Sequence, residues 1–107
     1  MAEDDVLWRA LADPTRRQIL DLLRAGPMTT GALCEHFDTS RFAVMKHLNV
    51  LVEADLVIIN RRGRERLNFL NPTPLQRALW RWLRPLEEVA AARLNELKET
   101  LEKEVET

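Results

Sequence analysis

The sequence predicts a mainly α fold of the α+β class, in the order α-α-α-α-β-β-α. Three observations predict it. Apolar residues recur at three- and four-residue steps through the first half of the chain, as on buried helix faces. A β-branched run at residues 56–59 then breaks this period, and a second, alternating run follows Gly63. From about residue 74 the helical spacing returns and continues almost to Thr107.

Two helices are expected before residue 27. The first carries a short apolar stripe between Val6 and Leu11. The second begins at Asp13-Pro14, because Asp is a good N-cap and Pro at the first helical position gives up an N–H that has no partner there. Gly26-Pro27 ends it.

The third and fourth helices are close enough to form a helix-turn-helix. Thr29 or Thr30 can cap a short third helix, and the cluster Asp38-Thr39-Ser40 caps a fourth that runs to about Ala54. In such a motif the second helix enters the major groove of DNA. The spacing of Val44, Leu48 and Leu51 turns one face of that helix inward and leaves its first turns free.

A β-hairpin follows, with Gly63 able to take the positive φ that a tight turn requires. A lone hairpin is marginal in water, so this one must pack on the helices. Helices joined to such a hairpin form a winged helix-turn-helix.

The last helix is long: its leucine stripe extends over ~30 residues, or about 45 Å. Pro85 is expected to kink it or split it in two. We therefore divide the chain into a winged helix-turn-helix DNA-binding domain, residues 1–72, and a C-terminal dimerisation helix, residues 73–107, of the same structural unit. A monomer of this size cannot cover the stripe, so a homodimer is expected. The predicted dimer interface comprises Trp8, for which core packing is an equal alternative, and Leu79, Trp80, Trp82, Leu83, Leu86, Ala90, Leu94 and Leu97.

The charge is distributed unevenly. The net charge is −1, yet residues 41–66 hold six basic residues against three acids, and residues 85–107 hold seven glutamates against three basic residues. Charge alone does not separate a DNA-binding surface from a solvated one, but the basic residues fall on the fourth helix and the hairpin. Arginine suits guanine edges and phosphates, lysine suits phosphates, and apolar side chains suit thymine methyls. The predicted DNA-binding residues are Thr30, Ser40, Arg41, Phe42, Met45, Lys46, Asn49, Arg61, Arg62, Arg64 and Arg66.

Several of these segments resemble one family. The run from Leu11 to Leu23, LADPTRRQILDLL, is similar to the first core helix of ArsR/SmtB-type bacterial regulators, and residues 40–51 resemble their recognition helix. Residues 54–57 with 61–64 resemble the start of their wing. The resemblance covers about residues 6–70 and implies a homodimeric repressor that leaves its operator when a signal binds.

Metal sensing, which many members of that family perform, is not expected here. The resemblance places paired cysteines just ahead of Cys34, where this chain has Thr29-Thr30-Gly31, and histidines on the last helix, where none follows His47. Cys34 and His36 are two apart on a helix and point to opposite sides. We expect no metal and no cofactor, and we interpret Cys34 as a small core residue and His47 as an orienting group near the core.

Other functions are less well supported. No nucleophile–base pair, glycine-rich phosphate loop or metal cluster is visible, so an enzyme is not expected. No apolar run approaches the ~18 residues of a membrane span, and the acidic N-terminus and single cysteine favour the cytoplasm. Two alternatives stay open: a winged helix that binds protein, which should lack the basic face, and a metal-responsive repressor. The small-molecule or protein inducer is not readable from the sequence.

Overall fold

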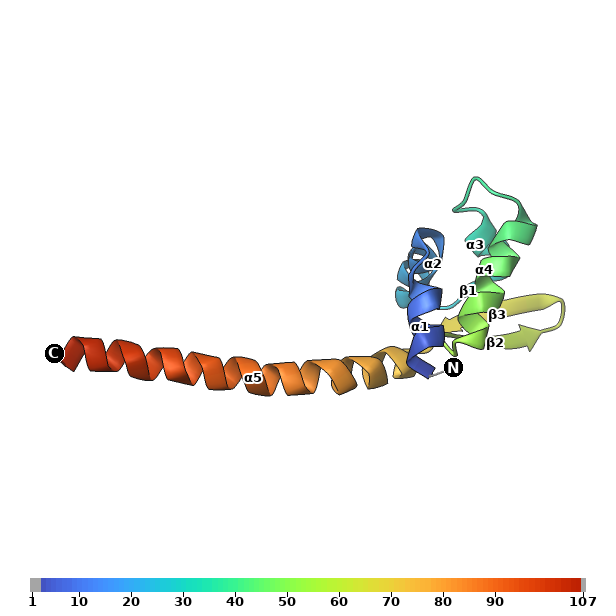
Figure 1. The fold of residues 1–107 in the computed structure, drawn as a ribbon. Helices are drawn as coiled ribbons and strands as arrows, with labels where there is room; N and C mark the ends of the chain where they lie inside the picture. The colour runs from blue at the N-terminus through green and yellow to red at the C-terminus, as the bar shows by residue number, and fades with distance from the viewer. Residues whose placement is uncertain (1–2, 107) are drawn as a thin grey trace. The chain divides into compact units, whose positions relative to one another are not determined.

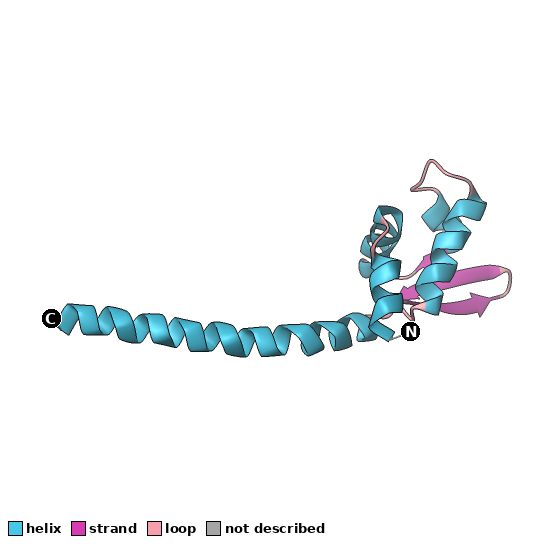
Figure 2. Ribbon diagram, in the orientation of Figure 1, coloured by secondary structure: helices cyan, strands magenta, loops and turns pink. Residues whose placement is uncertain are grey.

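The computed structural model describes residues 3–106. Residues up to Leu75 form one compact unit, and residues from Gln76 on form a second. Figure 1 labels the elements along the chain, and Figure 2 separates helix from strand. In order they are α1 (Glu3–Leu11), α2 (Pro14–Arg24), β1 (Met28–Thr29), α3 (Thr30–Cys34), α4 (Arg41–Glu53), β2 (Val57–Arg62), β3 (Glu65–Leu70) and α5 (Thr73–Glu106).

The junction between α1 and α2 is held by side chains that cap both helix ends. The Asp13 carboxylate accepts the N–H groups of Thr15 at 2.8 Å and Arg16 at 3.2 Å, which confirms the predicted start of α2. Arg16 donates in return to the Arg9 and Ala10 carbonyls, both at 2.8 Å, at the end of α1. Because the last carbonyls of a helix have no partner within it, these bonds fix the angle at which α1 meets α2.

α3 and α4 begin where the hydroxyl caps were expected. The Thr29 hydroxyl accepts the Ala32 N–H, and the Ser40 hydroxyl accepts the Ala43 N–H, each at 3.1 Å. α3 is short, as expected, and ends at Cys34, which is half-buried rather than a full core residue. The inward face of α4, formed by Val44, Leu48 and Leu51, is completely buried.

α4 ends in a Schellman motif. The N–H of Asp55 donates to the Val52 carbonyl at 3.0 Å, and that of Leu56 donates to the Leu51 carbonyl at 2.9 Å. Asp55 takes the left-handed conformation, with φ of 58°. Leu51 and Leu56 are both buried, so the motif turns the chain from α4 directly into the sheet.

The sheet has three antiparallel strands in the order β1-β3-β2, one more than the sequence analysis predicted. β1 pairs Met28 with Asn68 and Thr29 with Leu67. It escaped prediction because two residues are too few to show a strand period. The hairpin turn between β2 and β3 contains Gly63 at φ of 61°, as the sequence indicated.

α5 is one helix from Thr73 to Glu106, with Pro85 inside it. Of the two effects expected of Pro85, a kink or a split, the split is wrong, since Figure 1 draws an unbroken ribbon; the kink stays a prediction. Pro85 removes a single intrahelical hydrogen bond, and it lies at an exposed position where its ring meets no packed neighbour of the compact core. Among the described residues no helix, this long one included, is apolar enough to cross a bilayer.

Candidate nucleic-acid interface

The first three turns of α4 carry an exposed polar face opposite its buried one. Ser40, Arg41, Lys46 and Asn49 are exposed, and the Phe42 ring is 69% exposed. α4 belongs to the helix-turn-helix segment, so this face is the one available to a groove. The free N–H groups of its first turn, beside Ser40, add a favourable position for a phosphate.

Lys46 and Phe42 contact each other on this face. The Lys46 ammonium lies 4.8 Å from the centroid of the Phe42 ring, one helical turn away. This cation–π contact places the positive charge beside an apolar ring. The pair therefore presents a charge for a phosphate next to a surface for a thymine methyl.

The hairpin meets α4 through Arg66. Its Nη1 lies 3.9 Å from the Met45 sulfur, so the wing and the exposed face of α4 are neighbours. The Arg66 Nε is buried and has no hydrogen-bond partner within residues 3–106. The two basic elements that the sequence analysis singled out thus touch at Arg66 and Met45.

The strand register sorts the wing arginines onto two faces. Arg61 lies directly opposite Arg66, and Ile59 lies opposite the buried Asn68, so these two arginines continue the face of the sheet that turns toward the core. Two like charges opposite each other repel unless an anion lies near them. A phosphate beside Arg61 and Arg66 would therefore relieve the repulsion between these two side chains.

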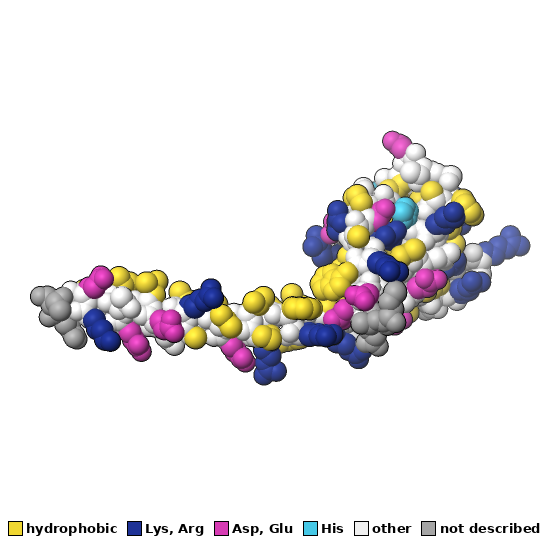
Figure 3. Space-filling model, viewed as in Figure 1, with side chains coloured by type: hydrophobic (Ala, Val, Ile, Leu, Met, Phe, Trp, Pro, Cys, Tyr) yellow, Lys and Arg dark blue, Asp and Glu magenta, His cyan; other side chains and the backbone are white. Residues whose placement is uncertain are grey.

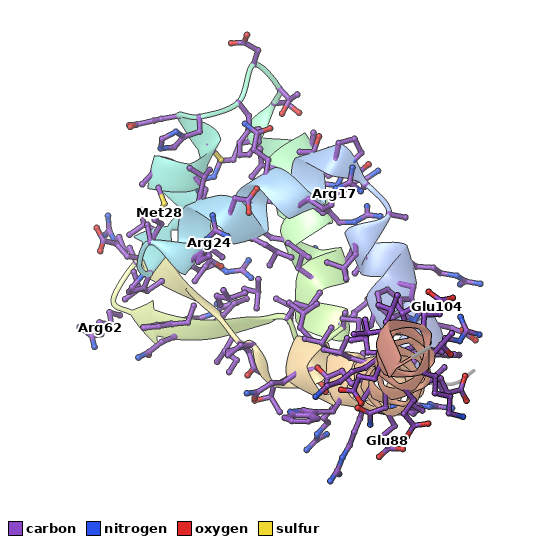
Figure 4. All side chains as sticks on the ribbon, turned by 90° about the vertical axis from the view of Figure 1, so that its left-hand side faces the viewer. Arg17, Arg24, Met28, Arg62, Glu88 and Glu104 are labelled. Carbon is purple, nitrogen blue, oxygen red and sulfur yellow. The ribbon has the colours of Figure 1, made fainter. Side chains whose placement is uncertain are left out.

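Arg62 is on the other face, opposite Glu65, and Arg64 is in the turn. Figure 4 shows Arg62 extending from the hairpin away from the helices. Its opposite charge, Glu65, weakens its attraction for a phosphate relative to Arg61. Within the described part of the chain no carboxylate pairs with the exposed arginines of α4 and the hairpin. The ion pairs Arg24–Asp21 and His47–Asp13, each at 3.9 Å, lie elsewhere. Figure 3 shows Lys and Arg side chains at the hairpin end of the compact unit.

Thr30 was predicted to contact DNA, and its burial contradicts this prediction. Its side chain is 2% exposed, and its hydroxyl accepts a hydrogen bond from the Asn68 Nδ2 at 3.1 Å. Asn68 also donates to the Met28 carbonyl at 3.2 Å. Thr30 therefore joins α3 to the sheet, and its side chain cannot reach DNA. Asn68 was missed, although a polar residue at an inward strand position between Leu67 and Phe69 is the signal that could have found it.

His47 on α4 contacts the junction between α1 and α2. Its Nδ1 lies 3.3 Å from an Arg16 guanidinium nitrogen and 3.9 Å from an Asp13 oxygen. Partial burial by itself raises the pKa of Asp13, but the Arg16 N–H, the His47 charge, the Thr15 N–H and the Arg16 charge outweigh it and hold that pKa below its ordinary value of 3.8. The α1–α2 junction and the middle of α4 are thereby joined through one polar cluster.

The residues predicted for the dimer interface are exposed. Trp8 on α1 is 47% exposed, and the predicted positions on α5 are exposed as well. In the second unit the Arg84 guanidinium lies 5.8 Å from the Trp80 ring. Within residues 3–106 no three His, Cys, Asp or Glu side chains gather in a way that could hold a metal ion.

The site combines a short helix, a turn, a second helix with one buried and one basic face, and an adjacent hairpin. This arrangement defines a winged helix-turn-helix of the DNA-binding class. The model of a family described as "Helix-turn-helix domain" matches residues 11–59. The transcriptional repressor SdpR of Bacillus subtilis (strain 168) is 44% identical over 70 residues, which are 65% of this chain and 78% of that protein. The HTH-type transcriptional regulator YuzN of the same organism is 40% identical over 86 residues, covering 74% of this chain and 94% of the relative.

Solved structures agree with these relatives. An ArsR family transcriptional regulator superposes with a TM-score of 0.76 and 31% identity, covering 84% of this chain and 98% of that one. An ArsR-like transcriptional regulator from Rhodococcus sp. RHA1 gives a TM-score of 0.71 at 30% identity, with 92% of both chains covered. This chain belongs to the ArsR/SmtB family of winged helix-turn-helix transcriptional regulators, which are DNA-binding proteins and not enzymes. The family and fold predicted from the sequence are confirmed.

Proposed function

We propose that this protein is a homodimeric, sequence-specific repressor of transcription that a non-metal signal releases from its operator. Residues 1–72 form the DNA-binding domain, and residues 73–107 form the dimerisation helix. α4 enters the major groove, and the wing follows the adjacent backbone or minor groove. Repression, rather than activation, rests on the similarity to proteins named as repressors, among them SdpR and an arsenical resistance operon repressor of Staphylococcus xylosus.

The observation that carries the proposal is the contact between Arg66 and Met45. It makes the basic hairpin and the exposed face of α4 one surface rather than two separate patches. Phosphate contacts from the arginines fix the register of the protein on the duplex, and the base contacts of α4 supply sequence specificity. The proposed contact residues are Ser40, Arg41, Phe42, Met45, Lys46, Asn49, Arg61, Arg62, Arg64 and Arg66.

A homodimer binds both half-sites of an operator. A two-fold dimer places two α4 helices about one turn of DNA apart, roughly 34 Å, which matches two half-sites of a palindrome. The proposed interface is formed by the exposed apolar residues of α5, with Trp8 of α1.

The proposal that the signal is not a metal rests on the sequence. Thr29-Thr30-Gly31 occupies the place of the paired cysteines that the family uses in one site, and no histidine follows His47 for the other. A transition metal requires three or four converging ligands. Addition of Zn²⁺ to the protein–DNA complex should therefore leave the fraction of bound DNA unchanged in a gel-shift titration.

The DNA-binding surface is tested with the promoter fragment that the purified protein retains from its own genome. Replacing Arg41 and Lys46 with alanine should weaken binding to this fragment by about 2–4 kcal/mol, because both the base contacts and the phosphate contacts of α4 are lost. The matched control replaces Arg24 and Arg77, which removes the same charge from exposed positions outside this surface. Equal affinity of wild type and the Arg41/Lys46 variant would refute the assignment.

A further inference from the structure

The outward face of α4 ends in a carboxylate that is absent from the proposed contact residues. Four exposed residues, which we call the α4 stripe, follow one another at steps of four, three and four positions: Phe42, Lys46, Asn49 and Glu53. Residues at these steps lie on one side of a helix. At about 100° per residue, that side is opposite the buried one that carries Val44 and Leu48. Glu53 therefore points in the same direction as the residues proposed to read bases.

The charge along α4 changes sign from its first half to its end. Arg41 and Lys46 lie in the first half, whereas Glu53 closes the last turn and the exposed Asp55 follows it. The last turn holds no basic residue, although a cation there would be favoured by the negative end of the helix dipole. Within the part of the chain that the structure describes, neither Glu53 nor Asp55 takes part in an ion pair. Their negative charge is therefore not neutralised by the protein itself.

The hairpin shows the same division of charge. Arg66, near the turn, contacts Met45 in the first half of α4, and Arg61 lies opposite Arg66 on the neighbouring strand. The root of the hairpin at Val57 instead follows the C-terminal end of α4, where the chain passes from helix to strand. The cations of both elements therefore lie toward the first half of α4, and the carboxylates lie at its other end.

α4 is longer than the major groove of DNA is wide. Its 13 residues span roughly 20 Å, whereas the groove is about 12 Å wide. Lys46 and Glu53 are separated by about 10 Å along the helix axis, which slightly exceeds the Debye length of about 8 Å at physiological salt. A phosphate close to one of these two charges therefore interacts mainly with that charge. The two halves of α4 thus have opposite preferences for the DNA backbone.

We infer that Glu53 is a specificity-determining residue, which repels DNA phosphates from the C-terminal end of α4 and so weakens binding to DNA that lacks the operator sequence. This inference rests on the proposed function. In the operator complex the base contacts hold α4 in one position, with its first half in the groove and Glu53 clear of the backbone. DNA without those bases is bound through its phosphates alone, in many positions. In some of these positions Glu53 meets a phosphate and is repelled, so the carboxylate disfavours non-operator DNA more than the operator.

Fluorescence anisotropy of the full chain with two duplexes tests the inference: the retained promoter fragment, and a scrambled duplex of the same length and base composition. Glu53→Gln removes the charge and keeps the size of the side chain. We expect it to bind the scrambled duplex about fivefold more tightly than wild type and the promoter fragment within about twofold of wild type. The slope of log K against log salt for the scrambled duplex should steepen by about one.

Two further variants complete the experiment. Glu53→Ala, which cannot hydrogen-bond to a base, should behave like Glu53→Gln. The matched control is Glu99→Gln, which removes the same charge from an exposed position on α5 and should leave both affinities within about twofold of wild type. Circular dichroism checks that all variants keep their helices.

The outcomes separate this inference from the proposed function. If wild type binds the promoter fragment no more tightly than the scrambled duplex, the sequence-specific repressor fails and this inference fails with it. If wild type discriminates and both Glu53 variants keep the same ratio of affinities, only this inference fails. A loss of promoter binding alone in Glu53→Ala would assign the carboxylate to a base contact and would also overturn the inference. A selective gain for the scrambled duplex in both Glu53 variants, with Glu99→Gln unchanged, supports it.

Discussion

Leucine is buried on a helix of the first unit and exposed on the helix of the second. Leu48 on α4 is completely buried, whereas Leu97 on α5 is 55% exposed, although each follows the three- and four-residue spacing of a buried helix face. α4 finds its cover within its own unit, from α2, α3 and β2. The stripe of α5 from Leu79 to Val105 finds no such cover within a single chain. Helical periodicity therefore identifies a face that must be covered, and the rest of the chain decides whether one chain suffices.

Leu48→Ala should have the largest effect on stability, because Leu48 is the buried member of this comparison. It removes buried methyl groups from a site with no exposure and should lower the free energy of unfolding of the compact unit by about 2–5 kcal/mol. Hydrogen exchange of the α2 and β3 amides is the local measurement. Leu97→Ala is the control and should leave exchange of these amides as in wild type. Equal effects of the two substitutions would remove the distinction between the units.

Asp13→Ala should cost less, about 1 kcal/mol, because it removes the cap from the N–H groups of Thr15 and Arg16. It also removes the acidic neighbour of His47 on α4. Urea denaturation followed by circular dichroism measures the loss. Asp13→Asn, which retains a capping oxygen, should recover most of the lost stability, and a failure to do so would assign the effect to charge rather than to the cap.

Asp55→Gly should stabilise the compact unit by about 0.5–1 kcal/mol. Asp55 has φ of 58°, a conformation that costs energy for any residue with a Cβ and little for glycine. The hydrogen bond that the Asn71 side-chain Nδ2 donates to the Asp55 backbone carbonyl, at 2.9 Å, survives the change. Thermal denaturation should show a higher Tm, and Asp55→Ala should not. A lower Tm for the glycine variant would contradict the strain assigned to this position.

The smallest expected effect is a pH dependence that originates at Asp13. Its pKa in the folded protein lies below the ordinary 3.8, so the folded state favours the carboxylate. The resulting stability is fully present above the unfolded pKa, near pH 4, and is lost as pH falls through the lower folded value. Wild type minus Asp13→Asn, measured by urea denaturation between pH 6 and pH 2.5, isolates this contribution from that of the other carboxyl groups. A difference that does not change with pH would refute it.

Local capping and turn chemistry made much of the fold predictable. Asp13-Pro14 and Ser40 mark the starts of α2 and α4, and Gly63 marks the hairpin turn, because each satisfies a backbone requirement within a few residues. The strand β1 was not predictable, since its two residues are defined only by their pairing with β3, about 40 positions away in the chain.

The candidate site was predictable as a surface, but not residue by residue. The inward spacing of Val44 and Leu48 identified the outward face of α4. Thr30 was misplaced because a five-residue helix shows no clear face, and its burial depends on the distant Asn68. The separation of Arg61 from Arg62 required the strand register, which fixes the face of every side chain but is invisible in a run of arginines.

Oxidative footprinting of the full chain, with and without the retained promoter fragment, tests the central claim most directly. Phe42 on α4 is 69% exposed, and Val89 on α5, which is not among the residues predicted for the dimer interface, is 48% exposed; both side chains react with hydroxyl radicals. DNA should protect Phe42 several-fold and leave the oxidation of Val89 unchanged, because α4 enters the groove and α5 does not. Unchanged oxidation of Phe42 on saturating DNA would show that α4 and the wing are not the DNA-binding surface.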